Sequence, residues 1–529
     1  MRLGDWDAMP LTLAQDSESA DVSTELVDVG QGTAESDYAG KDVRGKIVLA
    51  AAQPGPVARL AVAKYGAVGI VSYAQNQRTA WWGENENLVR WGHLETFDPV
   101  KTFGFMVSLK TARGLRERLA KGEPIRLHAK VKAGQHAGAY SILTAVIPGA
   151  DAKLREEEIV FSCHLDHPRP GANDNASGCA TILEVARTLQ KLINEGRLAR
   201  PARTIRFVWP PEIEGTVVLL NARPDIAARI KAAIHMDMVG GGPETKAVFH
   251  VTRGPMSLPS FVNDVAEAFA EFVNEQSYEF AATGKAKYPL VAPEGGKEAL
   301  QAQMTEFTMG SDHQVYTDSS WKIPALFLND WPDRYIHTNW DTPANIDPTK
   351  LKRAAFIGAA SGYFLAQLKW SDMEALDYVV EGARLRRLAR NWKLHVGLPP
   401  NEVYPHDLSS FYDYGIGESI ERHLSGVKKH SWPRFELDRF ELNKKRYSSG
   451  VRLQATGDGL LVFSRNAEIK GPMSVFGYDY FEDKYGEERA KKLKLLQYQG
   501  LRGSGEEYAY EALNFVNGNW NALQIRDAV

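Results

Sequence analysis

The sequence predicts an α/β protein with a mostly parallel sheet that is flanked by helices. Within residues 139–370, short apolar segments typical of strands alternate with helical segments. Strands that are buried on both faces of a parallel sheet form such continuous apolar runs. A chain of 529 residues is also too long for one ordinary domain, so further domains are expected on either side.

The strands and the main helix of this region can be placed from their periodicity. The expected strands cover residues 144–149, 158–166, 204–211, 232–240 and 323–330. Between the second and third strands, apolar side chains at helical spacing predict a helix over residues 176–196, which ends at Gly196.

Residues 22–138 predict a separate small β/α module. A helical run from residue 58 leads through Gly66 into a buried strand, and residues 125–133 alternate apolar and polar side chains as a half-exposed strand does. Trp81, Trp82 and Trp91 lie in one loop and either line a cleft or pack the module. We expect residues 1–21 to belong to the 139–370 domain.

The chain beyond residue 370 has a different character. A charged amphipathic helix at residues 373–393 opens a helical and irregular connecting region, 371–450. Residues 451–529 read as a small helical unit similar to a winged helix. Acidic and basic residues are nearly balanced there, which favours a docking or homo-oligomer surface over nucleic-acid binding.

Composition excludes several classes of function. Hydrophobic residues make up 44% of the chain and charged residues 24%, with a net charge of -3. This charge gives no reason to expect nucleic acid or an anionic membrane as partner. No apolar run approaches the roughly 18 residues of a membrane span, and no secretory signal is visible. The compartment therefore stays undetermined.

Metal-binding side chains follow the expected strands at their carboxyl ends. They are His164, Asp166, Asp174, Glu212, Glu214, Asp237 and His337. Ligands of open α/β sheets collect at this edge, and imidazoles with carboxylates suit zinc. Cys163 and Cys179 are the only cysteines, too few for a thiolate zinc site. The sequence thus predicts a zinc site built from His, Asp and Glu.

The motifs around these residues resemble a known family. HLD, GANDNASG, PPEIEG, HMDMVG, GSDH and IHTNWDT, in this order, are similar to the co-catalytic zinc aminopeptidases, such as bacterial leucyl aminopeptidases and glutamate carboxypeptidase. The resemblance covers about residues 139–365. The preceding module, with RGKIVL, resembles the protease-associated domain that this family often carries. The resemblance implies a zinc exopeptidase fold of the phosphorylase/hydrolase type and an aminopeptidase that cleaves peptides.

The resemblance also assigns roles to individual residues. Asp174 would bridge two zinc ions, with His164 on one ion and Asp237 and His337 on the other. Asp166 and Asp341 would orient the ligands by hydrogen bonds. His313 or Tyr316, in GSDHQVY, would polarise the scissile carbonyl. His167, His235 and His250 receive no role.

One motif departs from the family. Two adjacent glutamates are usual after the third strand, the first as general base and the second as zinc ligand, whereas this chain has Glu212, Ile213 and Glu214. We favour Glu212 as the base and Glu214 as a ligand, with the exchanged roles as the alternative. Two zinc ions are expected, with a single ion as the alternative.

Two further readings stay open. A carboxypeptidase, dipeptidase or amidohydrolase would keep the fold and change the substrate. Asp312 and Glu212 favour recognition of a free α-amine, while Arg334 could bind a terminal carboxylate. An inactive binding protein should have lost its metal ligands, and this chain retains them.

Overall fold

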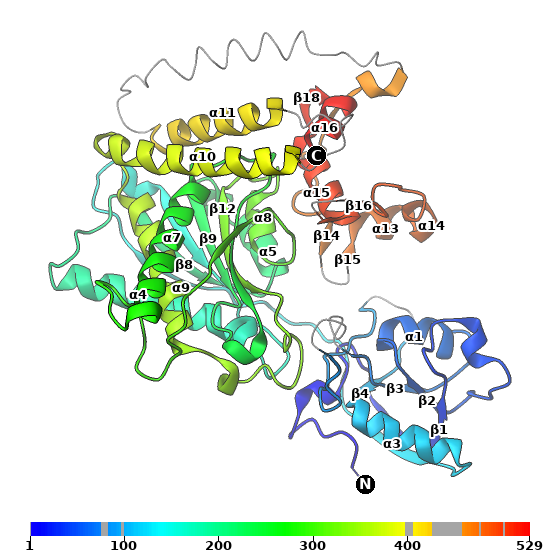
Figure 1. Ribbon diagram of the computed structural model, residues 1–529. Helices are drawn as coiled ribbons and strands as arrows, with labels where there is room; N and C mark the ends of the chain where they lie inside the picture. The colour runs from blue at the N-terminus through cyan, green and yellow to red at the C-terminus, as the bar shows by residue number, and fades with distance from the viewer. Residues whose placement is uncertain are drawn as a thin grey trace.

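Figure 1 shows the computed structural model of the chain, an N-terminal module beside a larger α/β domain. The structure describes residues 2–75, 83–96, 100–396, 406–425, 457–475, 478–500 and 503–529. Trp81 and Trp82 lie outside these ranges. Among the described helices, none has the length and apolar character needed to cross a membrane.

The N-terminal module is a five-stranded sheet with a hydrophobic cluster on each face. Its strand order is β4 (Gly104–Met106), β3 (Gly69–Ser72), β2 (Ile47–Ala50), β1 (Ala20–Asp28) and β5 (Arg126–Val131). Only β5 runs antiparallel to its neighbour. Side chains alternate across β2, so that Ile47 and Leu49 meet α3 (Leu109–Ala120) while Val48 and Ala50 meet α1 (Pro54–Ala61).

The first residues of the chain belong to this module, and our expectation that residues 1–21 join the larger domain was wrong. The backbone N–H of Ala14 donates to the carbonyl oxygen of Gly104 over 2.9 Å. Leu11 is buried in a cluster with Met106. The apolar residues 9–14 therefore cover the open edge of the module beyond β4.

The larger domain contains a seven-stranded sheet, in which five strands overlap the predicted ones and two, β10 (Val248–Thr252) and β11 (Gln303–Thr305), were not predicted. Its order is β11, β10, β12 (Ala325–Trp331), β9 (Ile230–Asp237), β7 (Glu158–Ser162), β8 (Thr204–Trp209) and β6 (Leu143–Ile147). The four strands from β12 to β8 are parallel. β6 is antiparallel to β8 and β10 to β12, which makes the sheet mixed at its edges.

Helices cover both faces of this sheet, as expected. On one face lie α4 (Gly178–Asn194), α7 (Phe261–Thr283) and α9 (Pro348–Gln367), and on the other α5 (Glu214–Ala222) and α8 (His313–Thr317). Because side chains alternate along β7, Phe161 packs on the face covered by α4, α7 and α9, and Val160 packs on the face covered by α5 and α8. A Cβ at Gly362 of α9 would lie 2.3 Å from Phe161, so this glycine permits close packing of helix and sheet.

The C-terminal part of the chain docks on the larger domain. α10 (Met373–Val396) begins at the predicted position and packs against α7, where Arg387 pairs with Asp264. α11 (His406–His423) also contacts α7. Tyr510 of α15 (Gly505–Phe515) donates its hydroxyl to the carbonyl oxygen of Gln314 over 2.7 Å. The winged-helix likeness of residues 451–529 stays a prediction.

Candidate metal centre

Candidate ligands gather at the carboxyl edge of the central parallel strands. His164 lies two residues after β7, and Asp237 is the last residue of β9. Asp174 lies in the helical turn η4 (Ala172–Ser177) between β7 and α4, and His337 follows β12. Because β7, β9 and β12 are parallel neighbours, their ends bring residues far apart in sequence to one edge.

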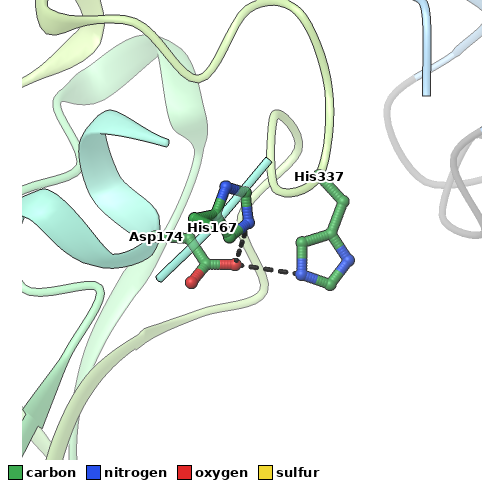
Figure 2. A group of neighbouring side chains, drawn as sticks. All are labelled: His167, Asp174 and His337. Atoms are coloured by element: carbon green, nitrogen blue, oxygen red, sulfur yellow. Dashed lines mark ion pairs between the residues drawn. The ribbon is translucent and has the colours of Figure 1, made fainter. Parts of the chain in front are cut away.

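Among the described residues, two groups of three could each hold a cation, and Asp174 belongs to both. The first group is His164, Asp174 and Asp237; the second is His167, Asp174 and His337. Asp174 Oδ1 lies 3.2 Å from His164 Nε2, while Asp174 Oδ2 lies 2.9 Å from His337 Nε2 and 3.1 Å from His167 Nε2. Figure 2 shows both imidazoles of the second group directed at this oxygen. The two oxygens of one carboxylate therefore face two different sites.

The first group fits a divalent cation by its chemistry. His164 Nε2 and Asp237 Oδ1 are buried and have no hydrogen-bond partner in the described part of the chain. Buried polar atoms are seldom left unpaired in proteins, so such atoms indicate a ligand. Burial opposes protonation of His164, but Asp237 and Glu212 outweigh it and raise the pKa of the imidazole. A cation would satisfy the same negative potential with the imidazole neutral.

Neighbouring groups hold the ligands in place. His164 Nδ1 donates to the carbonyl oxygen of Asp166 over 2.9 Å, which leaves Nε2 with its lone pair. The carboxylate of Asp341 accepts the backbone N–H groups of Asn173 and Asp174 over 2.6 and 3.0 Å. Asp341 thus supports the turn that carries Asp174, while Asp166 supports His164 through its backbone.

Glu212 lies beside the first group without belonging to it. Its Oε2 is 4.0 Å from His164 Nε2. The backbone N–H of Glu212 donates to Asp166 Oδ1 over 2.7 Å, and that of Ile213 donates to Asp312 Oδ1 over 3.0 Å. Burial raises the pKa of the Glu212 carboxyl, with further contributions from Asp237. A dication nearby would oppose this rise, because positive charge favours the carboxylate.

Three predicted site residues do not reach either group. Glu214 begins α5 with an exposed side chain, which accepts a hydrogen bond from the hydroxyl of Tyr140 over 2.8 Å. His313 is buried in α8, where its ring stacks on Phe327 at 4.1 Å and its Nε2 donates to a backbone carbonyl. Tyr316 is fully buried in the core under the sheet. The helical turns at residues 214 and 313–317 direct these side chains away from the sheet edge.

The structure also changes the expected grouping of ligands. Asp237 lies with His164, its Oδ2 being 3.4 Å from His164 Nε2, and not with His337. His337 is instead paired with His167, to which sequence reasoning gave no role. The available signal was the spacing HLDH, which places His167 in the same loop as His164 and Asp166. A histidine in a loop is usually a surface residue, so that signal was weak by itself.

A cavity of about 340 Å³ adjoins the second group. His167 and Arg169 of the larger domain line one part of it. Trp91 and Asp16 of the N-terminal module line another part. The rings of Trp91 and His337 also pack nearly at right angles, with their centroids 4.9 Å apart. The N-terminal module therefore forms one wall of the space beside the second group.

Residues 143–361 match the sequence model of Peptidase family M28. This part of the chain is thus similar to the members of peptidase family M28. The M28 match includes every candidate ligand, the supporting residue Asp341 and Glu212.

Several relatives of the M28 region carry names that state an activity. Leucine aminopeptidase 1 of Phaeosphaeria nodorum is 27% identical over 229 residues, which are 37% of this chain and 57% of the relative. Leucine aminopeptidase 1 of Pyrenophora tritici-repentis is 28% identical over the same shares of the two chains. The chain thus spans little more than half the length of these relatives.

Solved structures also resemble this chain. A zinc aminopeptidase from Bacillus subtilis has a TM-score of 0.47 at 18% identity, covering 66% of this chain and 78% of that one. An aminopeptidase from Aneurinibacillus sp. strain AM-1 has a TM-score of 0.39 at 25% identity, covering 67% and 77%.

Proposed function

We propose that this chain is a zinc-dependent aminopeptidase that removes N-terminal residues from peptides. The observation that carries the proposal is the position of Asp174, whose two carboxylate oxygens face two separate groups of metal-type ligands. The M28 match and the leucine aminopeptidase relatives support the same activity. We propose zinc at both positions, giving two ions per chain.

The donor set suits zinc at the first position. One imidazole and two carboxylates, with no further ligand among the described residues, leave room for water or substrate. When bound there, zinc would lower the pKa of water to about 7 and polarise the scissile carbonyl. His164, Asp174 and Asp237 would hold it.

A side chain of the protein would transfer the proton from the attacking water to the leaving amine. Glu212 is the carboxylate next to the first group that neither group uses as a ligand. It would accept the proton of the attacking water and then deliver that proton to the nitrogen of the leaving amine. The backbone hydrogen bonds of Glu212 and Ile213 to Asp166 and Asp312 hold this carboxylate in position. One side chain can therefore serve both proton transfers.

Recognition of the free α-amine must come from groups other than Asp312. This carboxylate is fully buried and accepts hydrogen bonds from Ile213 and Thr216, so a substrate cannot reach it. Our prediction that Asp312 helps to bind the free α-amine of the substrate was wrong. Asp16 is an acidic group that lines the cavity beside the second group, where it could meet the α-amine.

The activity can be tested on the purified full chain with paired substrates. Leucyl-p-nitroanilide offers a free α-amine, and N-acetyl-leucyl-p-nitroanilide has that amine blocked. We expect hydrolysis of the first only, loss of hydrolysis after treatment with 1,10-phenanthroline, and recovery when zinc is returned. Release of C-terminal residues from N-blocked peptides would indicate a carboxypeptidase. A zinc-loaded protein that hydrolyses none of these substrates would support the binding-protein reading.

A further inference from the structure

The second group lacks the glutamate that the family places after the third strand. Ile213 stands at that place, and its side chain is 1% exposed in a core cluster with Val160 and Val315. Glu214, the next acidic residue, turns to solvent and pairs with Tyr140. Neither side chain can serve a cation at the second group, so a second ion needs a different third ligand.

His167 is in place to be that ligand. Its Nε2 lies 3.1 Å from Asp174 Oδ2, and the His337 Nε2 lies 2.9 Å from the same oxygen. The two rings are 5.4 Å apart between centroids and converge on Asp174 from different loops (Figure 2). Three donor atoms, two from the loop between β7 and α4 and one from the segment after β12, thus surround one point, as the ligands of an ion do.

The hydrogen bonds of His167 leave its Nε2 ready to bind a cation. Nδ1 donates to the carbonyl oxygen of Pro168 over 2.6 Å, and a carbonyl can only accept, so Nδ1 keeps its proton and the neutral ring offers its lone pair at Nε2. Nε2 is buried and has no hydrogen-bond partner within the described ranges. A histidine that donates one nitrogen to a backbone carbonyl and directs the other at a carboxylate is placed as metal-binding histidines are.

Gly171 allows His167 and the backbone of Asp174 to approach each other closely. A Cβ at Gly171 would lie 2.5 Å from His167 Nδ1 and 2.5 Å from the carbonyl oxygen of Asp174. Any other residue at position 171 would push these two groups apart. The loop from His164 to Asp174 therefore folds back on itself closely enough for one loop to supply ligands to both groups.

We propose that His167 replaces the missing glutamate, so that the second position consists of two imidazoles and one oxygen of Asp174. This inference rests on the proposed zinc peptidase function and specifies its second ion. Two histidines and one carboxylate form a known three-ligand zinc set. Imidazoles favour Zn²⁺ and Co²⁺, whereas Mg²⁺ and Mn²⁺ favour oxygen ligands. The second position should therefore accept zinc or cobalt and discriminate against manganese and magnesium.

The two positions should also fill in order. The first position has two carboxylates, Asp174 and Asp237, while the second has only the shared Asp174 and two neutral imidazoles. Fewer negative ligands hold a dication less strongly, and the first ion repels the second. We expect the first equivalent of zinc to bind at His164 and the second, more weakly, at His167 and His337.

Metal content tests the proposal without relying on activity. The metal-free full chain is incubated with zinc, dialysed, and analysed by mass spectrometry of its metals. We expect about two zinc ions per chain for the wild type and for the control variant His250→Ala, which removes a half-buried histidine of β10 away from the site. His167→Ala should hold about one. His167→Glu should regain the second ion and, unlike the wild type, also accept Mn²⁺ there.

Anomalous diffraction from zinc-loaded wild-type crystals tests the same point without any substitution. We expect one peak near Asp174 Oδ1 and one within bonding distance of His167 Nε2. A second peak that His167 does not contact, or two ions retained by a folded His167→Ala, would overturn the inference. A wild type that hydrolyses leucyl-p-nitroanilide with one ion would refute this inference and the second ion, and would leave the proposed aminopeptidase activity standing. Two ions bound to a wild type that hydrolyses nothing would support the His167 site and refute the proposed activity.

Discussion

The backbone N–H of Trp91 donates a hydrogen bond to the carbonyl oxygen of His337 over 2.7 Å. This bond joins the N-terminal module to a candidate ligand of the larger domain. Around it, Arg90 and Thr338 form an antiparallel bridge, and Asn339 Oδ1 accepts the backbone N–H of Val89 over 2.8 Å. The module therefore positions His337 as well as forming a wall of the adjacent cavity.

Removing the Trp91 ring should weaken metal binding at the second position. The ring packs nearly at right angles to that of His337, with the centroids 4.9 Å apart, and limits its orientations. We expect Trp91→Ala to raise the dissociation constant of the second zinc roughly tenfold, the lower end of the range for residues that support ligands. Competition with a chromophoric chelator measures this constant. Tyr278→Ala, an exposed aromatic on α7, is the control; equal constants in the two variants would contradict a positioning role.

Substitution of Glu212 and of Glu214 should affect the turnover number very differently. Glu212→Gln should lower the turnover number by roughly 10²–10⁴-fold, because the proton acceptor is lost, while both zinc ions stay bound. Glu214→Gln is the matched control and should behave like the wild type, since Glu214 contacts Tyr140 at the surface. The two variants are compared by their steady-state rates with leucyl-p-nitroanilide and by their zinc content. Full activity in Glu212→Gln would remove Glu212 as the base.

Asp341 should matter for stability as well as for metal binding. Its carboxylate accepts two backbone N–H groups, those of Asn173 and Asp174, in a buried place. Asp341→Ala would leave both unpaired, at a cost of roughly 1–3 kcal/mol each. We expect the free energy of unfolding in urea to fall by about 2–6 kcal/mol. The exposed Asp42→Ala serves as control, and a change no larger than in that variant would show that other groups hold the turn.

Acid should destabilise the fold partly through His423. Burial, with the nearby Arg203, lowers the pKa of this imidazole to about 3, and its Nε2 donates to the carbonyl oxygen of Leu365. An unfolded histidine has a pKa near 6.5, so between these values the unfolded state binds the proton more strongly. The stability from this residue is thus full above pH of about 6.5 and decreases as the pH falls, by about 2 kcal/mol at pH 5.

This pH effect can be isolated by substitution. Unfolding in urea at pH 7 and pH 5 should show a smaller difference for His423→Gln than for the wild type. His136→Gln, which changes an exposed histidine, should keep the wild-type difference. An unchanged difference in His423→Gln would assign the acid sensitivity to other buried groups.

The strand pattern and the strand-end ligands could be predicted because each depends on short stretches of sequence. Continuous apolar segments defined β7, β8, β9 and β12, and the residues after them carried the metal-type side chains. His164, Asp174 and Asp237 converge because parallel strands end at the same edge. The family motifs added the role of Glu212.

Tertiary structure decided which of these side chains meet. Whether Glu214 or His167 faces Asp174 depends on the direction of a helical turn and on how tightly one loop folds back, and neither is visible in local periodicity. The same holds for residues 1–21, whose apolar side chains could cover either sheet. The α/β sheet and the kind of chemistry at its edge follow from local sequence alone. Only the fold in three dimensions decided the partners of each ligand, because a ligand set is defined by directions and distances between segments remote in the chain.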